Sequence, residues 1–328
     1  SADSAQRAAT QLGISKWFSS TQELLANSDI DVVHICTPNA SHASLALAAI
    51  AAGKHVICEK PLAVSVAEAQ ELAEAAAAAG LVATVPFVYR FHPMVREARD
   101  RIATGKTGRV ISVRGTYLQD WLLEASDDNW RVDSAAGGAS RAFGDIGSHL
   151  VDLTEFVLGD RIVALNAVSN IAHPERVGKP VTTEDEVALL FKTATGVIGT
   201  LMVSQVAAGR KNRLQLDIAG TSESIEFNQE QPETLWLGRR AGSIILPRDE
   251  SQNSAATNRY STVPSGHPQG YVDAFAAFVN DTYQAIQLNA RDAASQIDGL
   301  PTFTDGLRSA KVIDAVLSSS ASGQWVTL

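Results

Sequence analysis

Residues 30–62, IDVVHICTPNASHASLALAAIAAGKHVICEKPL, decide the fold. They contain two short β-branched runs on either side of an Ala-rich stretch that ends at Gly53. We predict strands at residues 30–36 and 55–58, the first of them buried on both faces, and a helix at residues 41–52 that Gly53 terminates. This order is typical of a βαβ unit on a parallel sheet, so the predicted fold class of this part is α/β.

The flanking residues continue the same pattern. Ser65 and Glu68 form an S-x-x-E capping box, which predicts the start of a helix that ends at Gly80. The other predicted elements are helices at residues 4–12, 21–26 and 93–104 and a strand at residues 82–86. We therefore place a first domain at residues 1–106.

From Arg109 onward, apolar and polar residues alternate over longer runs, which is typical of an antiparallel sheet with one covered face. We predict about six strands and a hairpin turn at Thr195-Gly196. The strands are expected at residues 110–119, 162–172, 186–192, 197–206, 214–219 and 224–227, and helices at 143–158, 270–288 and 304–319. The second domain, residues 107–328, is predicted to be α+β, with its C-terminal helices packing near the domain junction.

Composition excludes several classes of partner. The formal charge is -9 and no Lys/Arg cluster is present, so neither nucleic acid nor an anionic membrane is expected to bind. Cys36 and Cys58 lie in apolar runs that we expect to be buried strands, and only two cysteines indicate a reducing compartment. With no apolar stretch near ~20 residues and no signal-peptide pattern at the start, we predict a cytoplasmic protein.

The start of the chain differs from a complete Rossmann-type dinucleotide-binding domain. No G-x-G-x-x-G occurs in the 328 residues, and a helix rather than a strand comes first. In such a domain this glycine turn follows the first strand and brings the pyrophosphate to a helix N-terminus. We expect the first strand and the glycine turn to be missing from the sequence, and activity to require them. The alternative is a complete chain whose fold starts differently.

Two polar turns follow the predicted strands. Thr37-Pro38-Asn39 and Glu59-Lys60-Pro61 lie at carboxyl ends of strands, where open α/β sheets bind ligands, although an ordinary strand-to-helix turn also explains the first. A lysine at position 60 can stay cationic, hold a substrate oxygen and favour its alkoxide form. The alternative is a surface lysine paired with a carboxylate.

Asp145 and His149 are four residues apart in a predicted helix and therefore share one face. The carboxylate could hold the imidazole in one tautomer, and His149 could then take a hydroxyl proton. A pair of solvated side chains on the helix surface is the alternative. The local sequence offers no third and fourth metal ligand, so we expect no metal site.

Several motifs together resemble the glucose-fructose oxidoreductase / inositol dehydrogenase family. They are CTPNASH at residues 36–42, GKHV at 53–56, CEKPL at 58–62, GDIGSH at 144–149 and PTFTDG at 301–306. The resemblance extends over essentially the whole chain apart from the glycine turn. It implies a Rossmann-type domain and a mainly antiparallel substrate and oligomerisation domain.

The resemblance also implies a function. The chain is expected to transfer hydride between NAD or NADP and a secondary alcohol of a sugar, anhydrosugar or cyclitol, with Lys60, Asp145 and His149 as catalytic residues. The expected cofactor-binding residues are Asp3, Thr37, Pro38, Asn39, His42, Glu59, Lys60, Pro61 and Arg90. The expected substrate-binding residues are Lys60, Tyr89, Asp120, Trp121, Trp130, Arg131, Asp145, His149, His267 and Tyr271.

Three further expectations accompany this assignment. An acidic residue after the second strand of the domain favours NAD over NADP, and Asp3 is the nearest, although Ser1 or Ala2 could equally occupy the place. A homodimer or homotetramer is expected through the C-terminal sheet, with apolar contacts from Val187, Leu189, Ile198 and Leu201 if they lie outward. The alternatives to a dehydrogenase are an NAD-dependent glycoside hydrolase and a non-catalytic regulator of the same fold.

Overall fold

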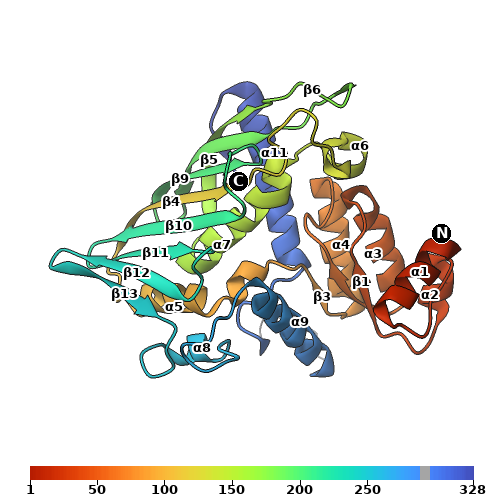
Figure 1. Ribbon diagram of the computed structural model, residues 1–328, viewed down its shortest axis with the longest axis horizontal. Helices are drawn as coiled ribbons and strands as arrows, with labels where there is room; N and C mark the ends of the chain where they lie inside the picture. The colour runs from red at the N-terminus through yellow and green to blue at the C-terminus, as the bar shows by residue number, and fades with distance from the viewer. Residues whose placement is uncertain (289–295) are drawn as a thin grey trace.

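The computed structural model describes residues 1–288 and 296–328 and contains two main sheets (Figure 1). The first is parallel, in the order β1-β2-β3, as expected for βαβ units. Its strands are β1 (Val32–Ile35), β2 (His55–Cys58) and β3 (Ala83–Thr84), and its helices are α1 (Ala2–Leu12), α2 (Thr21–Ala26), α3 (His42–Ala51) and α4 (Val66–Ala79). The predicted α/β class of this part is confirmed.

Local sequence explains where α4 begins and ends. The Ser65 hydroxyl accepts a hydrogen bond from the Glu68 backbone N–H, which satisfies one of the free donors of the first turn. Gly80 ends the helix at φ 66, a left-handed conformation that glycine adopts without steric cost. The return bond of a capping box from the Glu68 side chain does not form among the described residues, so only half of the predicted motif is present.

Three expectations about the first sheet differ from the structure. β1 is not buried on both faces: His34 is exposed and the two valines before it are only half-buried, because β1 is the edge strand. Cys36 is also exposed, whereas Cys58 is buried. The strand predicted at residues 82–86 shrinks to two residues because the chain then turns to the C-terminal part, where the Val85 N–H bonds the Pro301 carbonyl at 3.1 Å.

The second sheet has nine strands in the order β13-β12-β11-β10-β4-β9-β8-β5-β14. All neighbouring pairs are antiparallel except β4 and β9. The strands are β4 (Val110–Leu118), β5 (Ile162–Asn170), β8 (Glu186–Thr193), β9 (Ile198–Ser204), β10 (Arg213–Gly220), β11 (Ser224–Asn228), β12 (Thr234–Arg239), β13 (Gly242–Pro247) and β14 (Val326–Thr327). The six predicted strands are confirmed; β12, β13 and β14 were not predicted, and a small hairpin of β6 (Glu175–Arg176) and β7 (Lys179–Pro180) stands apart.

Helices cover one face of this sheet (Figure 1). They include α5 (Pro93–Ala103), α7 (Ser148–Leu158) and α11 (Phe303–Ser322), and further helices are α6 (Ser134–Gly137), α8 (Ala255–Asn258) and α9 (Tyr271–Gln287). In most of the strands, alternate residues enter the core that these helices close, whereas β13 contributes only Leu246. Val187, Leu189 and Leu201 belong to this core, so their expected place on the outer face is wrong; Ile198 is exposed as expected.

The C-terminal helices contact both parts of the molecule. α11 packs against β5 on one side and α4 on the other, and α9 packs against the 3-10 turn Val88–Phe91. The first-sheet core therefore includes Phe303 from α11. The domain limits at residues 106 and 107 stay a prediction. Among the described residues, no helix is both long and apolar enough to cross a membrane.

Candidate active site

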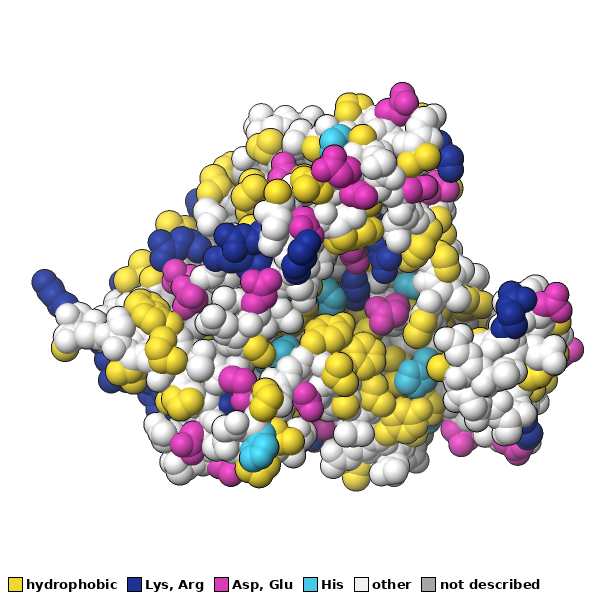
Figure 2. Space-filling view, in the orientation of Figure 1, with side chains coloured by type: hydrophobic (Ala, Val, Ile, Leu, Met, Phe, Trp, Pro, Cys, Tyr) yellow, Lys and Arg dark blue, Asp and Glu magenta, His cyan; other side chains and the backbone are white. Residues whose placement is uncertain are grey.

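A cavity of about 370 Å³ lies where the two parts of the molecule meet. Figure 2 shows basic, acidic and histidine side chains gathered in the hollow on this face. The lining residues are Glu59, Lys60, Tyr89, Tyr117, Gln119, Arg131, Asp145, Ile146, His149, Asn212 and Tyr271. The volume is in the usual range for small-molecule sites.

Lys60 enters the cavity from the end of β2. Its ammonium donates to the Asp145 backbone carbonyl at 2.9 Å and to Asp145 Oδ1 at 2.6 Å. Both side chains are largely buried, so this is not the surface pair that the sequence left open. An ammonium has three donors, and Asp145 takes two of them. One N–H is therefore left for a ligand.

Asp145 is the centre of the charge network in the cavity. Its Oδ2 accepts from Gln205 Nε2 at 2.9 Å, and Arg131 Nε lies 3.5 Å from Oδ1. Burial alone would raise the pKa of Asp145, but the charges of Lys60 and Arg131 and the Lys60 hydrogen bond outweigh it and hold this pKa below its usual range. Asp145 is therefore an anion that fixes the position of Lys60.

Asp145 does not hold His149, contrary to the expectation from their spacing. Asp145 lies in a π-helical turn, Phe143–Gly147, and α7 begins only after it. A π turn has more residues per turn than an α-helix, so side chains four apart are no longer aligned. The carboxylate bonds Lys60 and Gln205 instead, and no hydrogen bond joins it to His149 in the described part of the chain.

His149 is held by aromatic packing. The edges of Phe87 and Tyr89 contact its ring, with centroids at 5.8 and 5.1 Å, and its Nδ1 is buried without a described partner. Burial and the Lys60 charge hold the pKa of His149 well below 6.5, against a smaller opposite effect of Asp145. His149 is therefore neutral at pH 7 and able to accept a proton.

A second buried imidazole leads to a pH prediction. Burial lowers the pKa of His92 to about 4, against a smaller opposite effect of Asp273. Because the unfolded imidazole binds a proton below pH ~6.5 and the folded one does not, stability is lost as the pH falls below that value. Between about pH 7.5 and about pH 5, His92 should cost about 2 kcal/mol of unfolding free energy.

We expect His92→Phe, whose ring can keep the stack on Tyr89, to show a pH dependence smaller by that amount in urea titrations at the two pH values. The same loss of stability in wild type and variant would show that His92 does not titrate in this way.

Of the four residues predicted to contact the cofactor at the end of β1, two are exposed and two are buried in internal hydrogen bonds. Thr37 and Pro38 are exposed at the carboxyl edge of the sheet. Asn39 Nδ2 donates to the Gly137 carbonyl at 2.8 Å, which ties this turn to α6. His42 is fully buried between the carbonyls of Thr37 and Pro61, at 2.8 and 2.9 Å. The side chains of Asn39 and His42 therefore connect this turn to neighbouring turns by hydrogen bonds.

Arg90 does not face the cavity. Its guanidinium pairs with both carboxylate oxygens of Asp152, and Nη2 also lies 2.8 Å from Asp305 Oδ1. The guanidinium is held within this buried group and does not line the cavity, so its contact with the cofactor stays a prediction. Asp3 lies on the exposed start of α1, outside the cavity.

Only some of the predicted substrate-binding residues line the cavity. Tyr89, Arg131 and Tyr271 line the cavity, as do Lys60, Asp145 and His149. Four others do not line it: Asp120 binds Lys211, Trp121 donates to Gln119, Trp130 stacks on Arg131 and His267 is exposed. Trp121 and Trp130 therefore touch residues that line the cavity without lining it themselves.

Four functional candidates were not predicted, namely Tyr117, Gln119, Gln205 and Asn212. Tyr117 and Gln119 are two residues apart at the end of β4, and this period-two spacing could have placed them on one face. Asn212 lies just before β10, and Gln205 just after β9, where side chains often reach a ligand. Nothing in the local sequence distinguishes these two from ordinary loop residues.

The carboxyl edge of the first sheet fits the nicotinamide end of a dinucleotide. Ile35 and Cys58 are paired in parallel register, so Thr37-Pro38 and Glu59-Lys60 leave the sheet side by side, next to the cavity. This edge combines an exposed turn, a carboxylate and a cation with a free N–H. Among the described residues, no group of three His, Cys, Asp or Glu side chains could hold a metal ion.

This fold and site define an oxidoreductase with a Rossmann-type NAD-binding domain. The model of the "Oxidoreductase family, NAD-binding Rossmann fold" matches residues 1–87, and that of the "GFO/IDH/MocA C-terminal domain" matches residues 95–226. The chain belongs to the glucose-fructose oxidoreductase / inositol dehydrogenase family, and the predicted family and fold are confirmed.

Named relatives agree with this placement. Levoglucosan dehydrogenase of Pseudarthrobacter phenanthrenivorans is 32% identical over 98% of this chain and 86% of its own. A solved levoglucosan dehydrogenase with NADH and levoglucosan has a TM-score of 0.91 at 32% identity, over 99% of this chain and 87% of that one. An oxidoreductase domain protein from Kribbella flavida is 37% identical, with a TM-score of 0.87 over 99% and 88%.

Proposed function

We propose that the protein oxidises a secondary alcohol of a neutral sugar, anhydrosugar or cyclitol with NAD⁺. The observation that carries this is a cation with a free N–H and a neutral imidazole in one cavity, at the sheet edge that fits nicotinamide. The relatives named for levoglucosan and inositol support the substrate class.

Side chains in the cavity can remove the proton of the substrate hydroxyl. Bound nicotinamide supplies the acceptor for the hydride that leaves the carbinol carbon. Lys60 donates its remaining N–H to the hydroxyl oxygen and stabilises the alkoxide that develops there. His149 takes the hydroxyl proton, and the carbon–oxygen double bond forms. Asp145, whose other carboxylate oxygen accepts from Gln205, positions Lys60.

The charges in the cavity favour a neutral substrate. Its lining carries two cations, Lys60 and Arg131, and two carboxylates, Glu59 and Asp145. The Arg131 guanidinium has three internal contacts, to Asp145, to Asn129 and to the ring of Trp130. A phosphate or carboxylate would thus meet no unpaired arginine, whereas hydroxyls find both donors and acceptors.

The proposal is tested by screening nicotinamide reduction with levoglucosan, myo-inositol, glucose and glucose 6-phosphate, each with NAD⁺ and with NADP⁺. We expect turnover of at least one neutral polyol, higher kcat/KM with NAD⁺, and little use of the phosphate ester. Cleavage of a glycoside without net change in the cofactor would instead indicate a hydrolase. Binding without turnover across the panel would contradict the proposal.

We further propose that a second copy of the chain covers the outer face of the nine-stranded sheet. Leu190, Ile198 and Trp325 are 51%, 56% and 49% exposed there and line an apolar groove of about 340 Å³. Exposed apolar patches of this kind mark interaction surfaces, and identical patches give closed dimers.

We expect Leu190→Asp to convert the oligomer to a monomer, because a buried carboxylate without a partner is costly. Light scattering after size-exclusion chromatography measures the mass. Ile14→Asp, at an apolar residue that is 54% exposed on the first part of the molecule, is the matched control and should leave the mass unchanged. An unchanged mass in Leu190→Asp would exclude this face as the interface.

A further inference from the structure

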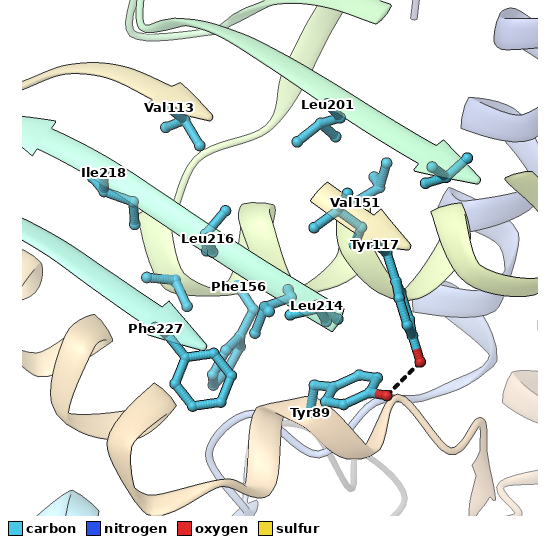
Figure 3. Close-up of a cluster of buried hydrophobic side chains, with 14 of the residues drawn as sticks. Tyr89, Val113, Tyr117, Val151, Phe156, Leu201, Leu214, Leu216, Ile218 and Phe227 are labelled. Carbon is cyan, nitrogen blue, oxygen red and sulfur yellow. Dashed lines mark hydrogen bonds between the residues drawn. The ribbon is translucent and has the colours of Figure 1, made fainter. Parts of the chain in front are cut away.

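One wall of the cavity is a connected hydrogen-bond network that neither the proton transfer nor the cofactor uses. Trp121 Nε1 donates to Gln119 Oε1 at 2.9 Å, and Gln119 Nε2 donates to Asn212 Oδ1 at 2.9 Å. Tyr117 donates to the same Asn212 oxygen at 2.7 Å, and its hydroxyl lies 2.6 Å from that of Tyr89. Figure 3 shows the two tyrosine hydroxyls pointing toward one another.

The direction of each bond follows from Trp121. An indole N–H can only donate, so the Gln119 oxygen faces Trp121 and its amide nitrogen faces Asn212. The Asn212 oxygen is then filled by two donors, and its amide nitrogen points the other way. Since Tyr117 has given its one hydrogen to Asn212, Tyr89 must be the donor between the two tyrosines.

This direction does not change with pH in the ordinary range. Burial raises the pKa of Tyr89 and, further, that of Tyr117, because an unpaired phenolate would be costly there. Both hydroxyls keep their hydrogens. The network thus stays neutral. Both of its arms, one starting at Trp121 and one at Tyr89, donate toward the Asn212 oxygen.

Unused donors remain at two positions of the wall. Gln119 has one amide N–H beyond its bond to Asn212, and Asn212 has one beyond its bond of 3.5 Å to the Tyr89 oxygen. Both residues line the cavity together with Lys60. A substrate held by Lys60 at its reacting oxygen therefore meets amide donors at another oxygen.

We propose that Asn212 is a specificity-determining residue, which with Gln119 donates hydrogen bonds to a non-reacting oxygen of the polyol. This rests on the proposed polyol oxidation. Because the amide N–H groups of this wall only donate, the substrate must present an oxygen that accepts a hydrogen bond. The hydrogen of that hydroxyl makes no contact with these donors. It should reject a deoxy analogue and tolerate, in part, a deoxyfluoro analogue, because fluorine accepts weakly and cannot donate.

The test combines substitutions in the protein with changes in the substrate, as in a double-mutant cycle. The full chain with cofactor is assayed on whichever of levoglucosan, glucose or myo-inositol it oxidises fastest, and on the deoxy and deoxyfluoro analogues at each non-reacting position. In the wild type we expect the deoxy change at one position to lower kcat/KM by about tenfold or more, mostly through KM, and fluorine to restore part of it.

Asn212→Asp replaces the amide donors by an acceptor of the same shape. The substrate hydroxyl can donate to this new carboxylate, so the deoxy penalty can persist in the variant. Fluorine cannot donate, and it should therefore no longer restore any of the lost kcat/KM at that position. Asn212→Ser, which also lacks the amide, should behave alike and guards against misfolding of the first variant. Asn27→Asp is the matched control: Asn27 Oδ1 only accepts from the Asp29 N–H, on the far side of the first sheet, so the full penalty and its partial rescue by fluorine should remain.

The outcomes separate the two proposals. One outcome is turnover in which fluorine restores the same part of kcat/KM in the wild type and in both Asn212 variants. This overturns the role of Asn212 and leaves the proposed oxidation intact. No oxidation of any polyol by the wild type overturns the proposed function itself, and with it this role.

Discussion

Replacing Lys60 by alanine is expected to lower kcat by about 10² or more, the typical contribution of a positioned proton-handling group. The ammonium is the only cation that donates directly to Asp145 Oδ1 and its carbonyl among the described residues, and it has one N–H left for the substrate. Without it, no ammonium group donates to the developing alkoxide, and Asp145 loses its nearest partner.

The control for this change is Lys211→Ala. Lys211 also pairs with an aspartate, Asp120, but it is 79% exposed and does not line the cavity. Steady-state kinetics and thermal melting of both variants, with cofactor present, separate catalysis from folding. We expect kcat to change only in Lys60→Ala. Wild-type turnover in that variant would remove Lys60 from the mechanism.

Arg90→Leu should lower the free energy of unfolding by about 3–5 kcal/mol, the usual cost of breaking a buried ion pair. The guanidinium lies between Asp152 and Asp305, with all three side chains at most 14% exposed. Removing it leaves two carboxylates facing each other away from water. Arg90 belongs to the first part of the molecule, whereas Asp152 in α7 and Asp305 in α11 belong to the second, so the variant loses one of the ion-pair groups that join the two parts.

Urea unfolding measures this effect, and Arg114→Leu is the matched control. Arg114 pairs with Asp217 at 2.8 Å but is 69% exposed, so its loss should cost ~1 kcal/mol or less. If the two variants were equally stable, Arg90 would not be a structural residue, and its predicted role at the cofactor would regain support.

The fold was largely predictable because it follows from two periodicities. Apolar runs of four residues that alternate with Ala-rich helices predicted the parallel sheet, and period-two alternation predicted six strands of the second. The exceptions are physical. β13 has five exposed residues of six, so no apolar periodicity distinguishes it, and β14 has only two residues. β1 was expected to be buried, but burial depends on which strands flank it.

Site residues could be predicted only where they belong to a recognisable sequence motif. Lys60, Asp145 and His149 do meet in one cavity, but the partner of Asp145 was wrong because a π turn at residues 143–147 changes which side chains align. The ion pairs of Arg90 could not be predicted because its two aspartates lie 62 and 215 residues away in sequence. Asn212 and Gln205 had no local signal at all.

We propose above all that hydride is transferred from a polyol carbon to nicotinamide in the cavity that Lys60 and His149 line. The most direct measurement uses a substrate of the panel with deuterium at the reacting carbon and follows the label by mass spectrometry and NMR. We predict that the deuterium appears on nicotinamide C4 in equal amount to the ketone formed, and that both fall together in Lys60→Ala. Label released to water, or ketone formed without label on the cofactor, would contradict the account.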